Sequence, residues 1–304
     1  MSARAAWRHR LEDRLAGLVW LYTRIAPRAL VLATGRLLGR LVGELDRRHL
    51  RIAVENLRPS FPDWTEARLW RTARGVYAHL GMLLLDLVWM SGRTRDEITA
   101  LVTLEGHEHV EAARARGRGV LFATAHIGSW EMCGVAHGWL SAPMGAVARP
   151  LDNPLLDRRI TAIRQMSGNQ VVDKRRALGR LLKKLRRGEE VALLLDQNVQ
   201  EQDGIFIDFF GRKAATTTSA ALLHLKTGSP IVGGWIECLP GGRYVLRYEP
   251  LPAVEPGGSR AVQVERLTRA INRMIEGWVR RAPEQWLWIH KRWHTRPPGE
   301  APRG

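Results

Sequence analysis

The chain has 304 residues, of which 45% are hydrophobic and 25% charged, a composition typical of a folded globular protein and not of a disordered one. Lys and Arg number 47 against 30 Asp and Glu, so the formal net charge is +17 at pH 7. The two cysteines, Cys133 and Cys238, are too few for a disulfide framework, which excludes the small disulfide-rich secreted class and favours a reducing compartment.

The positive charge gathers in two segments. The first 60 residues are clearly basic, and residues 174–187 (KRRALGRLLKKLRR) carry only basic charges. A GC-rich genome, which encodes arginine often, would account for part of this, but such patches also suit an anionic partner: nucleic acid, an acidic lipid surface or an acidic carrier protein. Nucleic acid is disfavoured, because segment 174–187 has no interleaved stacking aromatic residues and belongs to no known nucleic-acid-binding module.

The N-terminal residues predict a helix over 15–57, broken near Pro27. Acidic residues interrupt the basic N-terminus before any apolar core, so we expect no cleavable signal peptide. Apolar side chains recur with helical spacing, and arginines fall four residues apart in two pairs (24 and 28, 36 and 40). This pattern is typical of an interfacial amphipathic helix, although a helix packed on its own domain remains an alternative.

Further along the chain, a second helix is predicted over 65–91, and from residue 102 short β-like runs alternate with helical ones. The predicted strands are 102–106, 120–125, 145–150, 191–196, 230–238 and 244–251. The predicted helices are 107–117, 130–140, 153–167, 175–187, 216–227 and 259–281. This alternation predicts an α/β fold with a central mixed sheet flanked by helices. We therefore expect a helical, membrane-associating region over 1–100 and an α/β domain over 101–304.

The stretch ATAHIGSWEMCG (residues 123–134) holds the main catalytic candidates. His126 directly follows the predicted strand 120–125, at the strand end where open α/β sheets place their chemistry. If the chain bends at Gly128, Glu131 can reach one ring nitrogen of His126 and leave the other free to take a proton from a hydroxyl. A solvated turn histidine beside a helix-N-terminal glutamate is the alternative.

Two other chemistries are less well supported by this stretch. Gly128 and Ser129 do not form the G-x-S-x-G elbow of a serine hydrolase. The chain has neither an H-E-x-x-H motif nor a cysteine pair with metal-ligand spacing, so we expect no metal site.

Five segments, in this order along the chain, together resemble the lipid A late acyltransferases, the lauroyl/myristoyl transferase family of lipopolysaccharide biosynthesis, which are relatives of the glycerolipid acyltransferases. They are the His-x-x-x-x-Glu block, ARPLDNPLLD (148–157), LLLDQNVQEQDGIFIDFFGRKAATTT (193–218), TGSPIV (227–232) and PEQWLWIHKRWHTRP (283–297). The resemblance spans nearly the whole chain. It implies a glycerolipid-acyltransferase-like fold and transfer of an acyl chain from a thioester to a hydroxyl of a lipid A precursor.

The resemblance also implies roles for individual residues. His126 would be the general base, oriented and charged by Glu131, and Arg149 would stabilise the oxyanion of the tetrahedral intermediate. The hydroxyl would attack the thioester directly, with no enzyme nucleophile. Six further positions are predicted to contact substrate: Asp196, which would pair with Arg149 or shape the pocket, Gln197, Asn153 (or a plain helix cap), Phe209 and Phe210 in a loop over the acyl chain, and Arg292 in a cationic C-terminal patch for headgroup phosphates, unless that segment packs on the domain.

Partners and location follow from the same resemblance. We expect no cofactor, with an acyl-carrier-protein or CoA thioester as co-substrate, a glycolipid acceptor and an anionic membrane surface. The basic segment 174–187, whose helical pattern sets leucines against Arg and Lys, could dock either an acidic acyl carrier protein or the anionic membrane surface. The expected location is the cytoplasmic face of the bacterial inner membrane, peripheral or monotopic. Two alternatives stay open: the same chemistry on another glycolipid or an aminolipid, and a non-catalytic protein that binds anionic membranes.

Overall fold

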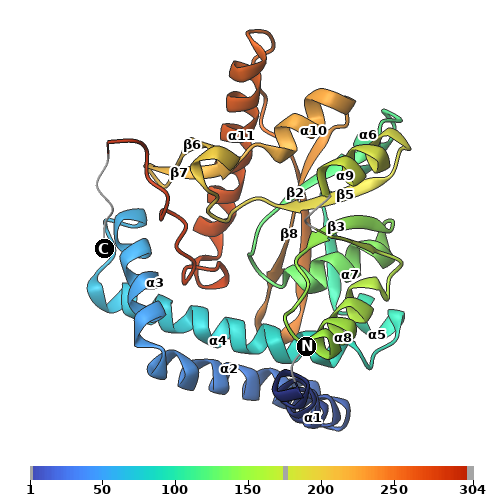
Figure 1. The fold of residues 1–304 in the computed structure, drawn as a ribbon, viewed down its shortest axis with the longest axis vertical. Coiled ribbons are helices and arrows are strands. Elements are labelled where there is room, and N and C mark those ends of the chain that lie inside the picture. The colour runs from blue at the N-terminus through green and yellow to red at the C-terminus, as the bar shows by residue number, and fades with distance from the viewer. Residues whose placement is uncertain (1–2, 174–176, 300–304) are drawn as a thin grey trace.

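A seven-stranded sheet with the strand order β1–β9–β8–β2–β5–β3–β4 forms the centre of the computed structural model, which describes residues 3–173 and 177–299 (Figure 1). Its strands are β1 (Val102–Glu105), β2 (Val120–Thr124), β3 (Met144–Ala148), β4 (Gln170–Asp173), β5 (Glu190–Leu194), β8 (Ile231–Cys238) and β9 (Tyr244–Pro250). Every neighbouring pair is parallel except β8 and β9, which are antiparallel, so the sheet is mixed, as the sequence predicted.

Both faces of the sheet are covered. Along β2, Leu121 and Ala123 belong to one apolar core and Val120 and Phe122 to another. The first core lies against α9, α10 and α11, and the second against helices α5 to α8. A strand that is apolar on both faces is typical of a parallel strand buried between two helical layers. The helices are α5 (Arg95–Thr99), α6 (His107–Arg114), α7 (Trp130–Leu140), α8 (Pro154–Gln165), α9 (Ala177–Arg186), α10 (Ser219–Thr227) and α11 (Arg260–Arg281).

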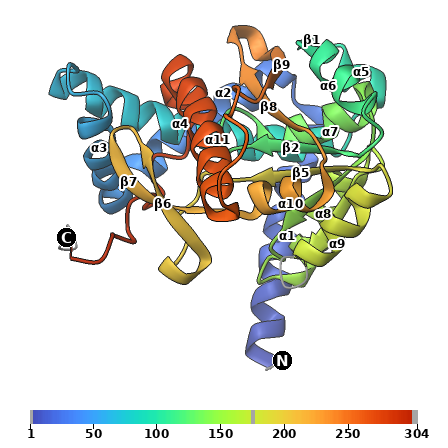
Figure 2. The ribbon, with the colours of Figure 1, turned by 90° about the horizontal axis from the view of Figure 1, so that it is seen from above.

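Four helices precede the α/β part: α1 (Ala3–Ile25), α2 (Arg28–Leu45), α3 (Arg47–Ser60) and α4 (Glu66–Met90). The break between α1 and α2 is at Pro27, as predicted. The first helix extends beyond the rest of the fold at its N-terminal end (Figure 2). Helices α2 and α4 lie side by side along the lower edge of Figure 1. None of the helices in the described part of the chain has the length and apolar character needed to span a bilayer.

The close packing of α2 on α4 depends on glycines spaced four residues apart. A Cβ added to Gly39 would lie 2.1 Å from the carbonyl oxygen of Tyr77, and one added to Gly81 would lie 2.2 Å from that of Gly35. Backbones approach this closely only where a glycine stands at the contact, so these positions fix how α2 lies on α4.

Three strands were not predicted from the sequence. The short β4 runs along the sheet edge, and β6 (Gly204–Phe209) and β7 (Arg212–Thr217) form an antiparallel hairpin outside the main sheet. We had expected the segment around Phe209 and Phe210 to be a loop over an acyl chain. It is the turn of this hairpin, and its two phenylalanines are buried against the C-terminal tryptophans.

Candidate active site

Two neighbouring parallel strands bring the central polar residues together. Thr124 at the end of β2 is in register with Leu194 at the end of β5, and the amide of Leu195 donates to the carbonyl oxygen of Thr124 (3.0 Å). His126 and Asp196 each follow their strand by two residues, so they project from the same edge of the sheet. This is the edge at which open α/β sheets bind their ligands.

The bend predicted at Gly128 is present. Its φ of +60° lies in the left-handed region, and a Cβ there would lie 1.5 Å from the carbonyl oxygen of Ile236. Only glycine adopts this φ readily and also leaves room for the Ile236 carbonyl oxygen. The Gly128 amide donates to the carbonyl oxygen of Gln285 (3.0 Å), and its own carbonyl oxygen accepts from His79 Nε2 (3.2 Å). Burial lowers the pKa of His79 to about 4, so this ring is neutral and acts as a support for the loop.

Asp196 holds the His126 ring. The Nδ1 atom of His126 lies 2.8 Å from Asp196 Oδ1, and the His126 amide donates to Asp196 Oδ2 (2.9 Å). Trp286 Nε1 donates to the same oxygen at 2.8 Å, and the ring of Trp130 meets the imidazole edge-on with centroids 5.3 Å apart. Because Asp196 accepts at Nδ1, the proton of the neutral ring lies on that nitrogen and the Nε2 lone pair faces outward.

The electrostatics of the pair favour a charged Asp196. Burial opposes ionisation of Asp196, but the charge and hydrogen bonds of His126 and the indole of Trp286 lower its pKa to about 2. For His126, burial acts to lower the pKa, and the negative charges of Asp196 and, more weakly, Glu131 outweigh it, so the pKa is raised. The imidazolium that forms when Nε2 takes a proton is thereby stabilised.

The predicted contact between Glu131 and His126 is wrong, because each of the two residues has another partner. Glu131 lies in the first turn of α7, where it forms a two-pronged ion pair with Arg164 of α8 (Oε1–Nη2 2.5 Å, Oε2–Nε 2.9 Å). The nitrogen assigned to Glu131 is taken by Asp196. Helix geometry explains the difference, because Glu131 points from α7 toward the neighbouring α8, whereas Asp196 comes from the adjacent strand.

The structure does not bring Arg149 to the histidine. Its side chain is 82% exposed, and the nearest carboxylate partner is Asp152 at 3.9 Å, so Asp196 pairs with His126 and not with Arg149. Asn153 takes the capping role. Its Oδ1 accepts from the Leu155 amide (2.9 Å) at the start of α8, and its Nδ2 donates to Glu12 of α1 (2.8 Å). This buried asparagine ties α1 to α8.

The C-terminal segment packs on the domain, and does not form the exposed cationic patch considered above. Arg292 is fully buried and donates to the Ala215 carbonyl oxygen (2.6 Å) and to Thr216 Oγ1 (2.6 Å). Burial lowers the pKa of Arg292 to about 10, and the charge of Asp196 acts in the opposite direction. Phe209 and Phe210 join the same buried aromatic cluster as Trp286 and Trp288. This cluster supports the site through Trp286, which donates to Asp196.

Gln197 and an apolar cavity lie near the histidine. Gln197 is exposed, with its Nε2 3.4 Å from His126 Nε2. A cavity of about 70 Å³ begins beside Thr124 and Trp130 and runs between the sheet and α7 to His137 and Tyr248. The rest of its lining is Phe122, Cys133, Gly134, Met144, Ala146, Ala192, Leu194 and Gly234. An apolar cavity beside a base suits an acyl chain.

Two further site residues were not found from the sequence. Trp286, which donates to Asp196, lies 160 residues from His126, and Arg164 holds Glu131 from a different helix. The PEQW segment that contains Trp286 carries part of the resemblance, but it does not predict the contact of Trp286 with Asp196. Within residues 3–173 and 177–299 there is no cluster of three His, Cys, Asp or Glu side chains placed to hold a metal ion.

Comparison with known proteins identifies the family. Residues 10–295 match the model of the bacterial lipid A biosynthesis acyltransferases. The chain belongs to this family. It is similar to the lipid A biosynthesis lauroyltransferase of Escherichia coli K12, with 29% identity over 93% of this chain and 91% of that protein. The palmitoleoyltransferase of the same organism is 27% identical over 94% of this chain and 91% of its own, and the myristoyltransferase is 24% identical over 86% and 80%.

The protein is therefore an acyltransferase. Because the match covers nearly the whole chain, the helices α2 to α4, the His126 loop and the C-terminal tryptophans all fall within the matched region.

Proposed function

We propose that this acyltransferase transfers a fatty acyl chain from an acyl thioester to a hydroxyl of a lipid A precursor, with His126 as the general base. The observation that carries the proposal is the His126–Asp196 pair, next to which Trp130 contacts the imidazole and lines an apolar cavity. The relatives named lauroyl-, palmitoleoyl- and myristoyltransferase of lipid A biosynthesis support the choice of acceptor.

In the proposed reaction, Nε2 of His126 takes the proton of the acceptor hydroxyl as its oxygen attacks the thioester carbonyl carbon. The C–S bond then breaks, and the imidazolium returns the proton to the leaving thiolate. Asp196 keeps the ring in the required tautomer and stabilises its charged form, as the third member of a catalytic triad does. No enzyme nucleophile takes part.

Two neighbours assist this step. The side-chain amide of Gln197, next to Nε2, is placed to donate a hydrogen bond to the developing oxyanion, the role first considered for Arg149. The apolar cavity beside Trp130 takes the part of the acyl chain next to the thioester. At about 70 Å³ the cavity holds only a short part of a fatty acyl chain, so a longer chain requires the cavity to widen or must extend outside it.

The N-terminal helices are proposed to hold the enzyme on the cytoplasmic face of the inner membrane. Apolar side chains lie exposed along α1 and α2: Trp7, Leu11, Leu15, Leu18, Leu21, Ile25, Leu30, Leu37, Leu38, Leu41, Val42 and Leu45. Exposed apolar side chains in this number favour an interaction surface, and exposed leucines beside arginines are typical of interfacial helices.

The donor is proposed to be carried by acyl carrier protein, which would dock on α9. The described part of the basic segment 174–187 is residues 177–187, because residues 174–176 lie outside the described residues. Leu181 and Leu185 of α9 are buried, while Arg180, Lys183 and Arg186 are exposed, so this helix presents a cationic outer face.

Lipid analysis of a strain that lacks this protein tests the function. We expect its lipid A to lack one acyl chain, and we expect the wild-type protein, but not His126→Ala, to restore it. Loss of a chain from another glycolipid or from an aminolipid would move the acceptor to that class. Restoration by His126→Ala, with the variant present at wild-type level, would contradict the mechanism.

A further inference from the structure

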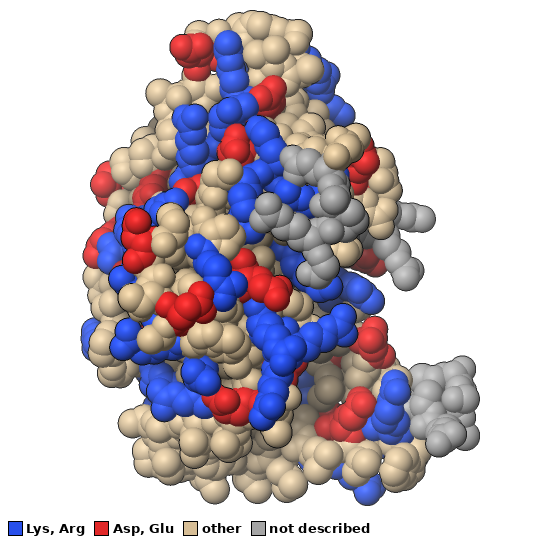
Figure 3. All heavy atoms as spheres, turned by 90° about the vertical axis from the view of Figure 1, so that its left-hand side faces the viewer, with Lys and Arg blue, Asp and Glu red and all other residues tan. Residues whose placement is uncertain are grey.

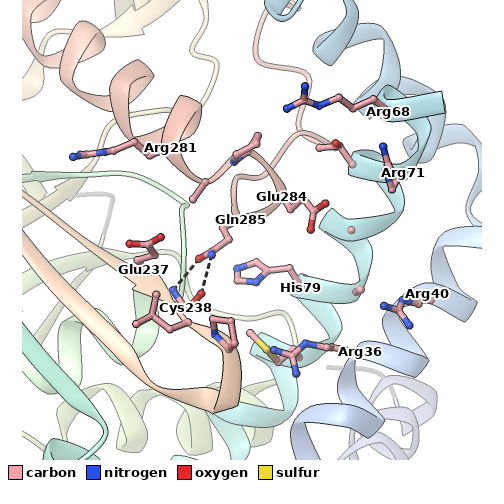
Figure 4. A pocket seen from close by; sticks show the side chains of 18 of the residues that line it. Arg36, Arg40, Arg68, Arg71, His79, Glu237, Cys238, Arg281, Glu284 and Gln285 are labelled. Atoms are coloured by element: carbon pink, nitrogen blue, oxygen red, sulfur yellow. Dashed lines mark hydrogen bonds between the residues drawn. The ribbon is translucent and has the colours of Figure 1, made fainter. Parts of the chain in front are cut away.

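A groove of about 800 Å³ lies between α2, α4 and the end of α11 (Figure 4). Five of its lining residues are arginines: Arg36 and Arg40 of α2, Arg68 and Arg71 of α4, and Arg281 at the end of α11. They come from both walls, so the groove concentrates positive charge in one place.

Of the five, Arg281 is paired with Glu249 of β9, and the charge of the other four is not neutralised by an ion pair among the described residues. Among the described residues, no carboxylate lies within 4.0 Å of the guanidinium of Arg36, Arg40 or Arg71, and Arg68 instead stacks on the ring of Trp64 (3.9 Å). Of the two acidic lining residues, Glu237 is already bound to Arg247 (2.9 Å), and Glu284 lies against Gly75 of α4, so one carboxylate stands in the groove against the four arginines without an ion pair (Figure 4). Unpaired guanidinium groups in a concave site are typical of a site for an anion, phosphate above all.

The fold holds the two arginine pairs in fixed relation. Arg36 and Arg40 each follow one of the glycines, Gly35 and Gly39, that pack directly on α4. Their Cα atoms are therefore set by a backbone-to-backbone contact and not by flexible side chains. A preformed set of donors loses less conformational entropy on binding than one that must be ordered.

The groove adjoins the catalytic loop. Two of its lining residues, His79 and Gln285, bind the carbonyl oxygen and the amide of Gly128, and Gly128 is two residues after His126, no more than about 7.6 Å away between Cα atoms. The next residue after Gln285 is Trp286, which donates to Asp196. A ligand in the groove thus lies beside the reacting centre.

The groove also adjoins the apolar face of α2. Leu37, Leu38 and Leu41 alternate with Arg36 and Arg40 along the same helix, and all three leucines are about half exposed. In Figure 3 the lower edge of the molecule, on the α2 side, is largely free of charged residues, and Lys and Arg lie above it. A lipid with an anionic headgroup fits this arrangement, because its hydrocarbon can lie on the apolar edge while its charged group lies in the cationic groove.

We propose that the arginine groove binds the phosphate of the acceptor lipid's headgroup, while the acyl chains of that lipid lie along the leucines of α2. This rests on the proposed function for the identity of the lipid as acceptor. Binding there places a headgroup hydroxyl beside Nε2 of His126 and restricts the enzyme to phosphorylated acceptors.

Binding to vesicles tests the groove without activity. The probes are phosphatidylcholine vesicles with and without phosphatidic acid, and the variant is Arg36→Gln/Arg71→Gln. The control is Arg260→Gln/Arg273→Gln, which removes the same charge from exposed positions on α11, well away from α2 (Figure 1). We expect the groove variant to lose at least about tenfold of the affinity that phosphatidic acid adds, and the control to lose less than about threefold.

Kinetics provide the second readout. With a phosphorylated acceptor the groove variant is expected to raise KM at least about tenfold with kcat nearly unchanged, and with the same acceptor lacking its phosphate the variant and the wild type are expected to be equal. Equal binding by groove and control variants overturns the proposal. So does binding of inorganic phosphate in the groove without preference for vesicles that contain phosphatidic acid. Normal groove binding by a wild-type enzyme without acyl transfer contradicts the proposed function and leaves the groove assignment standing.

Discussion

Replacing Asp196 with asparagine removes the negative charge beside His126 and keeps the shape of the side chain. The carboxylate accepts three hydrogen bonds, from the His126 ring, the His126 amide and the Trp286 indole. Asparagine has one acceptor oxygen, and its amide group would face a donor. The ring of His126 then favours the tautomer with its proton on Nε2, which cannot act as a base.

The expected loss is large. In the serine protease triad a buried carboxylate also orients a histidine, and replacing that aspartate with asparagine stabilises the wrong tautomer and lowers kcat by about 10⁴. Here Gln197 near Nε2 and the support from Trp286 remain, so we expect a loss of about 10³ to 10⁴ in kcat for Asp196→Asn. The pKa of His126 is also expected to fall, because the charge that raises it is gone.

The assay is acyl transfer by purified enzyme to lipid acceptor in detergent or vesicles, with kcat and KM measured separately. Circular dichroism and the melting temperature establish that Asp196→Asn is folded. Trp286→Phe is the matched variant that keeps the charge and removes one hydrogen bond, and we expect it to lose only about tenfold. A folded Asp196→Asn enzyme with kcat near that of wild type would refute the assignment of Asp196 as the orienting residue.

Three further predictions concern the surroundings of His126. Glu131→Gln is expected to lower kcat by about tenfold and to lower the pKa of His126, because Glu131 acts on the ring only through its charge; a loss as large as that of Asp196→Asn in the same assay would show a direct role instead. The rate is expected to fall as pH drops, with its acid limb above the ordinary histidine value of about 6.5, because His126 must be neutral and its pKa is raised; a pH–rate profile with the limb below that value would be contrary evidence. Gly134→Leu is expected to fill the apolar cavity and to shift donor preference toward shorter acyl chains, as competition between thioesters of different length would measure; an unchanged preference would remove the cavity from the acyl site.

The main sheet was predictable because its strands are short apolar runs with clear ends. β2, β5, β8 and β9 all lie within a residue or two of their predicted bounds. The β6–β7 hairpin was not found, because the resemblance predicted a loop over the acyl chain there, and the pairing of its strands depends on packing against α11 and the C-terminal tryptophans. Local pattern does not reveal that kind of tertiary support.

The sequence named three residues that the structure brings together, but not which of them pair. The sequence identified His126, Asp196 and Gln197, but spacing along the chain favoured Glu131 as the partner of His126 because it is only five residues away. The actual partner, 70 residues away, follows from the adjacency of β2 and β5, which no local pattern encodes. Arg292 shows the same limit, since its basic side chain predicted an exposed position and the fold buries it.

The most direct test of the central claim is the kcat of purified His126→Ala in the acyl transfer assay, with vesicle binding and melting temperature as controls. The proposed mechanism predicts a loss of at least about 10² to 10⁴ in kcat, since a positioned general base contributes that much, with binding and folding unchanged. A folded, membrane-bound His126→Ala enzyme that transfers acyl chains within about threefold of the wild-type rate would contradict it.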